Sequence, residues 1–210
     1  RDSGIPAGLI TTNPEEILAD PGIQILAEVI GGTDPATRYL KDALSAGKHV
    51  VTANKEVLAK SGPELMSLAK QNGVSLLFEA SVGGGIPIVG CLMNQLLAND
   101  IQSVQGIING TTNYILTRMA QAHTSFPQAL QEAQELGYAE TDPTNDIEGI
   151  DAVYKLSILA GLSFHRRVAP EAIFRQGISS LEAKDFLYAQ ELGYAIKPLA
   201  IAAMSGGAVQ

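Results

Sequence analysis

The chain has 210 residues, a formal net charge of -8 and a hydrophobic fraction of 46%, so it can bury a sizeable core as one large or two small domains. The acidic balance argues against a nucleic-acid partner, because phosphate binding requires a basic surface. No run of 18 apolar residues is present, so no membrane partner is expected, and the single cysteine favours a reducing, cytoplasmic location over a disulfide framework.

The first half of the chain alternates predicted helices with apolar segments of strand length. Asn13, followed by a proline and two glutamates, predicts the start of a short helix. Strands are predicted at 23–30, 49–53 and 74–80, and helices at 34–46 and 55–72, the second interrupted at Gly62-Pro63. This alternation indicates βαβ units and a mostly parallel sheet, and the apolar strands predict a sheet buried on both faces.

The second half changes character after a glycine-rich loop at 82–87. An apolar helix to about residue 99, a strand at 101–108, helices at 111–121, 126–136, 146–162 and 180–192, and a strand at 195–203 are predicted. We therefore expect an α/β chain with a nucleotide-type parallel sheet in residues 1–80 and an α+β domain in residues 81–210.

Two segments follow predicted strands at the edge where open α/β sheets bind ligands. Gly31 and Gly32 would let the backbone approach a ring or a sugar, although an ordinary strand-to-helix turn would also explain them. Lys55 could neutralise a cofactor phosphate or take part in proton transfer, or it could be a solvated lysine in the first turn of a helix.

Two glycine-containing segments predict further contacts. Glu79 and the carbonyls of the 82–87 loop could ligate a hard cation, although a loop that needs positive φ explains the glycines equally simply. The segment 109–114 (NGTTNY) joins a strand to a helix, where amides and hydroxyls suit a carboxylate; the alternative is N-capping by Thr111 or Thr112.

The segment from Glu140 to Lys155 carries five carboxylates in its first twelve residues. Asp151 and Lys155 have helical i,i+4 spacing and could form only an ion pair, worth about 0.3–0.5 kcal/mol. That alternative leaves the crowding of Glu140, Asp142 and Glu148 unexplained, because like charges so close cost stability. Such a cluster can hold an ammonium group with its acids and move a proton with its lysine, so it is the candidate active centre.

Five segments together resemble the homoserine dehydrogenase family, in order and over essentially the whole chain. They are EVIGGTDPA (28–36), HVVTANK (49–55), FEASVGGGIPI (78–88), NGTTNYILTRM (109–119) and ELGYAETDPTNDIEGIDAVYKL (135–156). The resemblance implies a Rossmann-type NAD(P)-binding domain followed by a catalytic and dimerisation domain. It also implies interconversion of L-homoserine and L-aspartate 4-semialdehyde in threonine, methionine and isoleucine biosynthesis, by a homodimer or homotetramer that uses NADP or NAD.

The resemblance also implies roles for individual residues. Lys155 would donate and accept the proton, Asp151 would hold Lys155 and contact the substrate, and Lys55 would act between cofactor and substrate. Glu140 and Thr111 would bind the substrate, and Gly31, Gly32, Lys55 and Gly137 would contact the cofactor. A sodium or potassium ion would bind Glu79 and the carbonyls of Val82, Gly84 and Ile86.

The family opens with a strand and a GxGxxG loop and often ends with an ACT domain, and this sequence shows neither. We therefore expect it to be part of a longer enzyme, with little cofactor affinity of its own. One alternative is a non-catalytic ligand-binding or dimerisation module, which the intact Glu140, Asp151 and Lys155 disfavour. Another is aspartate-semialdehyde dehydrogenase, which needs a nucleophilic cysteine in a loop at its active site. Cys91 does not meet this requirement, because it lies in a predicted apolar helix.

Overall fold

A computed structural model of the chain describes residues 4–210. The chain divides into two compact units, one ending at Gly85 and the other running from Ile86 to Gln210. The domain boundary between residues 80 and 81 stays a prediction. Within residues 4–210, no helix combines the length and the apolar character needed to cross a membrane.

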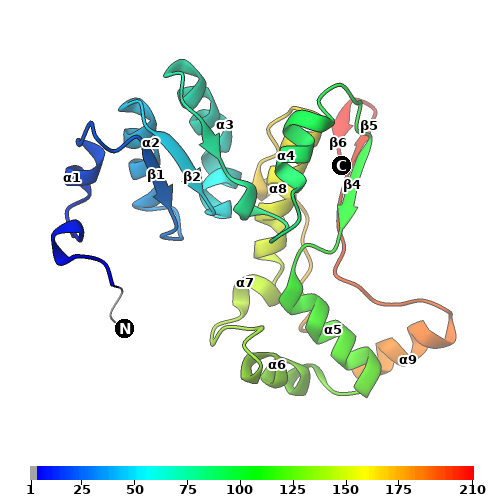
Figure 1. The fold of residues 1–210 in the computed structure, drawn as a ribbon. Helices are drawn as coiled ribbons and strands as arrows, with labels where there is room; N and C mark the ends of the chain where they lie inside the picture. Colours follow the sequence, from blue (N-terminus) through cyan, green and yellow to red (C-terminus); the bar gives the residue numbers. More distant parts are fainter. Residues whose placement is uncertain (1–3) are drawn as a thin grey trace. The chain divides into compact units, whose positions relative to one another are not determined.

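The first unit is a three-stranded parallel sheet with helices between its strands (Figure 1). Its strands, in the order β1-β2-β3, are β1 (Ile25–Glu28), β2 (His49–Thr52) and β3 (Leu76–Leu77). Its helices are η1 (Ala7–Leu9), α1 (Pro14–Leu18), α2 (Ala36–Ser45), α3 (Lys55–Gln71) and η2 (Glu79–Ser81). This arrangement confirms the predicted parallel α/β organisation.

Two predictions about this unit are wrong. The interruption at Gly62-Pro63 does not occur, because α3 is continuous from Lys55 to Gln71 with Pro63 inside it. The sheet is not buried on both faces either: Ile25, Val51 and Leu77 are 64%, 41% and 59% exposed, whereas Val50 and Leu76 are buried. Successive side chains of a strand point to opposite faces, and burial alternates along β2 because the helices of this unit cover a single face of its sheet.

The second unit packs helices against an antiparallel sheet of order β4-β5-β6 (Figure 1). Its strands are β4 (Ser103–Gly106), β5 (Ala200–Ser205) and β6 (Ala208–Val209). Its helices are α4 (Ile88–Gly90), the π-helical turn Cys91–Gln95, α5 (Gly110–Ala122), α6 (Phe126–Glu135), α7 (Thr144–Ile147), α8 (Ile150–Phe164), η4 (Pro170–Ala172) and α9 (Ala183–Glu191). Leu156, Ala160 and Phe164 of α8 form a core with Ala200 and Ala202 of β5.

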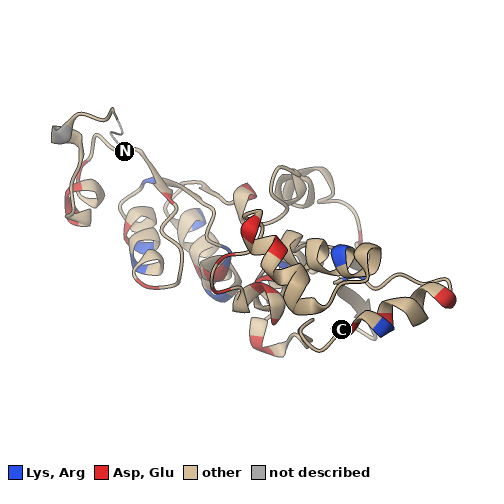
Figure 2. Ribbon diagram, turned by 90° about the horizontal axis from the view of Figure 1, so that it is seen from below, with Lys and Arg blue, Asp and Glu red and all other residues tan. Residues whose placement is uncertain are grey.

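The boundaries of several predicted elements differ in the second unit. The helix predicted at 146–162 is two helices, because Gly149 adopts a φ of 76° between α7 and α8. The last strand begins at Ala200 rather than 195 and forms a hairpin with β6, which was not predicted. The apolar helix ends at Gln95 in a π-helical turn, which leaves Cys91 half-buried. Acidic residues are spread over both units rather than gathered in one patch (Figure 2).

Helices α5 and α6 are joined by a polar contact at Glu132. Its carboxylate accepts hydrogen bonds from Arg118 Nε at 2.7 Å and from the Tyr114 hydroxyl at 3.0 Å. The hydrogen bond from Arg118, followed by that from Tyr114, holds the pKa of Glu132 below its ordinary value. The resulting stabilisation is therefore complete above the unfolded-state pKa, about 4.3, and is lost as pH falls through the lower folded-state pKa.

We accordingly expect Glu132→Gln to lower the free energy of unfolding at neutral pH and to have little effect at a pH below both pKa values. Urea denaturation of both proteins across this range measures the difference. Glu135→Gln is the control, because Glu135 lies on the same helix but is exposed, and its carboxylate accepts a hydrogen bond from the exposed Gln131 side chain. A Glu132→Gln effect of equal size at every pH would contradict the assignment.

Candidate active site

Asp146, Glu148 and Asp151 of the predicted acidic cluster lie where α7 meets α8, and α8 brings Asp151 and Lys155 together. Lys155 Nζ lies 2.7 Å from Asp151 Oδ2, so the predicted i,i+4 contact is confirmed. The two side chains are only 19% and 5% exposed, unlike an ordinary surface ion pair. Lys155 Nζ also donates to the carbonyl of Ile108 at 3.0 Å, which fixes the ammonium at the strand-to-helix junction.

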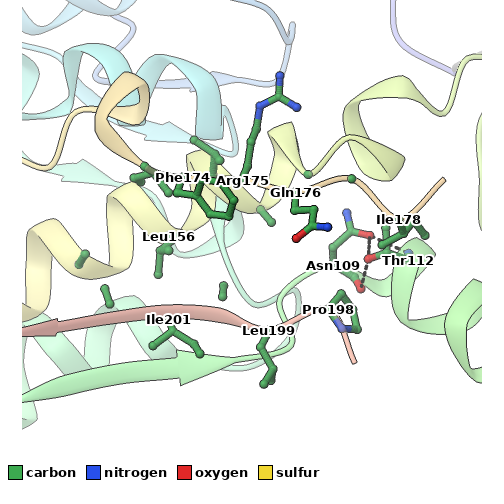
Figure 3. A pocket seen from close by; sticks show the side chains of 18 of the residues that line it. Asn109, Thr112, Leu156, Phe174, Arg175, Gln176, Ile178, Pro198, Leu199 and Ile201 are labelled. Atoms are coloured by element: carbon green, nitrogen blue, oxygen red, sulfur yellow. Dashed lines mark hydrogen bonds between the residues drawn. The ribbon is translucent and has the colours of Figure 1, made fainter. Parts of the chain in front are cut away.

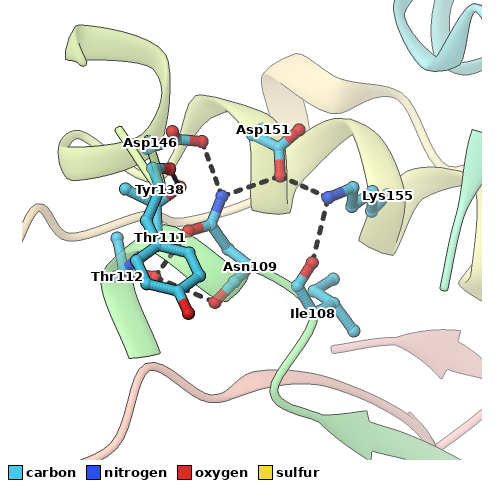
Figure 4. A network of polar contacts seen from close by, with 8 residues as sticks. All are labelled: Ile108, Asn109, Thr111, Thr112, Tyr138, Asp146, Asp151 and Lys155. Atoms are coloured by element: carbon cyan, nitrogen blue, oxygen red, sulfur yellow. Dashed lines mark hydrogen bonds and ion pairs between the residues drawn. The ribbon is translucent and has the colours of Figure 1, made fainter. Parts of the chain in front are cut away.

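Asn109 joins this pair to the rest of the cluster (Figure 4). Its Nδ2 donates to Asp146 Oδ1 at 2.7 Å and to Asp151 Oδ2 at 2.9 Å. Its Oδ1 caps α5 by accepting from the Thr112 backbone N–H at 2.8 Å. One buried amide thus donates to two carboxylates and begins a helix. Asn109 was not among the predicted site residues, although it begins the segment 109–114 whose amides were expected to suit a carboxylate.

Thr111 and Glu140 are associated with a neighbouring loop rather than with the ion pair itself. The Thr111 hydroxyl donates to the carbonyl of Tyr138 at 2.8 Å, and the Tyr138 ring stacks on Tyr114 with centroids 4.7 Å apart. The proposed capping by Thr111 or Thr112 is wrong, because Asn109 is the N-cap. Glu140 is exposed, and among the described residues its carboxylate has no hydrogen-bond partner.

Gly137 has a structural reason to be glycine. It follows the end of α6 with a φ of 78°, a left-handed conformation that glycine adopts without strain. This conformation is enough to explain a glycine at position 137, and the contact between its backbone and the cofactor stays a prediction.

An open pocket of about 1010 Å³ also lies within the second unit (Figure 3). Asn109 and Asp146 line one part of it, but Asp151 and Lys155 do not. Its wall is mostly apolar, with side chains such as Leu156 and Ile201. Four basic side chains, Arg166, Arg167, Arg175 and Lys197, also line it, but the Asp151–Lys155 pair does not, so the pocket is not taken as the candidate substrate site.

Three of the four predicted cofactor residues, Gly31, Gly32 and Lys55, lie at the carboxyl edge of the parallel sheet in the first unit, whereas Gly137 lies in the second unit. Gly31 and Gly32 have φ of 81° and 69°, and no atom lies within 4 Å of the position that a Cβ would take at either residue. Lys55 is the first residue of α3 and follows its N-cap, Asn54. The Asn54 amide donates to the carbonyl of Gly32 at 2.7 Å, so the two turns are linked.

Three of the predicted cation residues, Val82, Gly84 and Ile86, belong to the glycine-rich loop at 82–87, and Glu79 precedes it in the chain. Glu79 begins η2, Val82 is buried, and Gly84 has a φ of 59°. The carbonyl of Ile86, in the second unit, accepts from the Ile88 N–H at 2.8 Å. In the described part of the chain no group of three or more His, Cys, Asp or Glu side chains could hold a metal ion, so a cation here would depend on backbone carbonyls.

Comparison with known proteins covers nearly the whole chain. Residues 1–79 match the family model of the homoserine dehydrogenase NAD-binding domain, and residues 87–210 match that of homoserine dehydrogenase. The chain is 48% identical over 207 residues to homoserine dehydrogenase of Synechocystis sp. and 43% identical over 210 residues to that of Bacillus subtilis. It covers 48% of each relative, so the chain spans about half the length of these curated relatives.

Solved structures agree with this match. A homoserine dehydrogenase from Thiobacillus denitrificans aligns with a TM-score of 0.91 and 49% identity, over 95% of this chain and 46% of that one. A hyperthermophilic archaeal homoserine dehydrogenase in complex with NADPH aligns with a TM-score of 0.79 and 33% identity, over 95% of this chain and 58% of that one. Since the homoserine dehydrogenase model matches more than half of the sequence, the chain belongs to the homoserine dehydrogenase family.

Proposed function

We propose that the full-length protein interconverts L-homoserine and L-aspartate 4-semialdehyde, with NADP or NAD as the redox cofactor, in threonine, methionine and isoleucine biosynthesis. The observation that carries this proposal is the buried Asp151–Lys155 pair, placed by Asn109, in a chain of this family. A lysine ammonium held at a defined point can exchange a proton with a substrate oxygen.

Lys155 has the donors that this chemistry requires. Its ammonium has three N–H groups, of which one points to Asp151 and one to the Ile108 carbonyl, so the third is available to a substrate oxygen. The bound nicotinamide would supply or accept the hydride. The Lys155 ammonium would stabilise negative charge on the carbonyl oxygen and protonate it, and in the reverse direction the neutral Lys155 amine would take up the hydroxyl proton.

The remaining predicted residues have supporting roles in the proposal. Glu140, with an exposed carboxylate, would pair with the substrate ammonium, and Thr111 would help to position the substrate. Asp151 would orient Lys155 and contact the substrate. Among solved relatives, the archaeal homoserine dehydrogenase in complex with NADPH supports NADPH as the probe.

The cofactor and cation sites belong to the same proposal. The backbones of Gly31, Gly32 and Gly137 and the side chain of Lys55 would hold the cofactor. Sodium or potassium would bind the Glu79 carboxylate and three backbone carbonyls. Those carbonyls belong to Val82, Gly84 and Ile86.

We also propose a homodimer or homotetramer. Exposed apolar side chains in the second unit, including Leu192 at 72% and Tyr194 at 74%, support an interface between copies.

The deciding experiment follows the absorbance of the reduced nicotinamide when the full-length protein is given L-homoserine. NADP and NAD are compared, each in potassium, sodium or tetramethylammonium buffer. Turnover that requires potassium or sodium supports both the reaction and the cation site. A folded protein that oxidises no homoserine under any of these conditions rules the proposal out.

For Glu140→Gln we expect the KM for L-homoserine to rise about thirtyfold, because a charge-assisted contact to the substrate ammonium becomes a neutral one. The KM for NADPH should stay near the wild-type value. Glu135→Gln removes an exposed carboxylate five positions earlier and should leave both constants unchanged. An unchanged homoserine KM in Glu140→Gln would remove Glu140 from the substrate site.

A further inference from the structure

Glu28, which was not among the predicted site residues, is a buried carboxylate at the carboxyl end of β1. It is 2% exposed, although it ends a strand that is otherwise apolar. Its Oε2 accepts from the Thr52 hydroxyl at 2.6 Å, and its Oε1 accepts from the Ile30 N–H at 2.8 Å and from Asn54 Nδ2 at 3.5 Å. Burying such a group costs free energy unless its hydrogen bonds are made, and here both oxygens are used.

Asn54 extends these contacts to both turns at this edge of the sheet. Its Nδ2 donates to the Gly32 carbonyl at 2.7 Å as well as to Glu28. Its Oδ1 caps α3 by accepting from the Val57 N–H at 3.1 Å, and its own N–H donates to Thr52 Oγ1 at 2.9 Å. The Asn54 side chain, in the turn that leads to Lys55, thus hydrogen-bonds to the backbone of the turn that carries Gly31 and Gly32.

In the part of the chain that the structure describes, few other contacts hold the glycine turn in place. Gly31 and Gly32 have no side chains, and open space surrounds the positions of their absent Cβ atoms. The two residues before them, Val29 and Ile30, are 80% and 59% exposed and contribute little packing. The hydrogen bonds from Ile30 to Glu28 and from Asn54 to Gly32 are therefore the main restraints on this turn.

A second buried charge at the opposite edge of the same sheet provides a comparison. Lys48, directly before β2, is 4% exposed and donates to the carbonyls of Asp20 at 2.5 Å and Ile23 at 2.7 Å. It links loops at the amino ends of the strands, where none of the predicted cofactor residues lies. Lys48 thus serves as a comparison for Glu28: it is also buried and hydrogen-bonded, but it lies away from the predicted cofactor residues.

We propose that Glu28, Thr52 and Asn54 form a positioning network for cofactor binding. The network sets the backbone of Gly31 and Gly32 and the start of α3 at Lys55, and it acts through those residues rather than by touching the cofactor. This inference rests on the proposed function and extends it to three residues of the first unit.

The first test is Glu28→Gln in the full-length protein. Both carboxylate oxygens accept hydrogen bonds, whereas an amide has a single acceptor oxygen and cannot accept from both the Ile30 N–H and the Thr52 hydroxyl. We expect the KM and the Kd for NADPH to rise about tenfold, with kcat within about twofold of wild type. Fluorescence titration with NADPH measures the Kd without turnover.

A second variant, Asn54→Asp, separates capping from positioning. Aspartate caps a helix as well as asparagine does, but it cannot donate to Gly32 or Glu28. The same tenfold rise is expected here, whereas a residue that served only as an N-cap would leave the NADPH Kd unchanged.

Lys48→Met is the matched control, because it removes a buried charge from the other edge and should lower stability without changing the Kd for NADPH. A wild-type NADPH Kd in both Glu28→Gln and Asn54→Asp would overturn the network. A wild type that binds NADPH but oxidises no homoserine would overturn the proposed function, while the Kd values of the variants would still decide the network. A wild type that binds neither NADPH nor NADH would overturn both.

Discussion

Replacing Lys155 by methionine is expected to reduce kcat for homoserine oxidation about a thousandfold, with a much smaller change in the KM for NADPH. Methionine keeps most of the apolar stem of the half-buried lysine but lacks the ammonium that contacts Asp151 and the Ile108 carbonyl. Steady-state kinetics of the full-length protein, with both substrates varied, measures the two effects separately.

The control for this variant is Lys60→Met in α3. Lys60 also has an i,i+4 carboxylate partner, with Nζ 2.6 Å from Glu56 Oε1, but it is solvent-exposed. Its replacement should leave kcat within about twofold of wild type, because exposed pairs contribute little. General acid–base catalysis contributes about a hundredfold or more to a rate. If Lys155→Met kept more than about a tenth of the activity, the proton would therefore have to move through Lys55 or water.

Replacing Asn109 by aspartate should lower the free energy of unfolding by about 3 kcal/mol at neutral pH, because an uncompensated charge would be buried between two carboxylates. The Nδ2 donor shared by Asp146 and Asp151 would become an acceptor that repels both. The loss should shrink as pH falls, because a protonated carboxyl can donate again. Urea denaturation at several pH values measures this dependence, and kcat at neutral pH should also fall.

The chain contains a matched site for the same substitution. Asn13 caps α1 through its Oδ1 and donates from Nδ2 to Glu16 at 3.3 Å, but the site is exposed. Asn13→Asp should change stability by less than about 0.5 kcal/mol. Equal losses in Asn13→Asp and Asn109→Asp would show that the buried bridge between the carboxylates is unimportant.

Among the described residues, three asparagines are helix N-caps, and each of these also donates to a carboxylate. Asn13 contacts Glu16, Asn54 contacts Glu28, and Asn109 contacts Asp146 and Asp151. Aspartate would cap equally well but could not make the second bond, which explains the use of asparagine at the two buried sites. In those two places the second bond also joins segments far apart in the chain.

Local patterns were sufficient for most elements of the fold. The alternation of strands and helices predicted the parallel sheet, and the spacing of Asp151 and Lys155 predicted their contact, because both depend on periodicities within a few residues. Predictions failed where a local signal was overridden. Pro63 lies inside a continuous helix with buried Val57 and Leu65, and one glycine, Gly149, divides a segment whose apolar pattern is helical throughout.

The residue types and short-range spacings were enough to propose the acidic cluster and the glycine turn as candidate sites, since each lies within one stretch of sequence. The partners of these groups depended on the tertiary structure. Asp151 meets Asn109 across 42 residues, Lys155 meets the Ile108 carbonyl across 47, and Glu28 meets Thr52 across 24. Such contacts arise only when separate strands and helices pack together, and no periodicity along the chain encodes which of its many polar side chains will then be buried side by side.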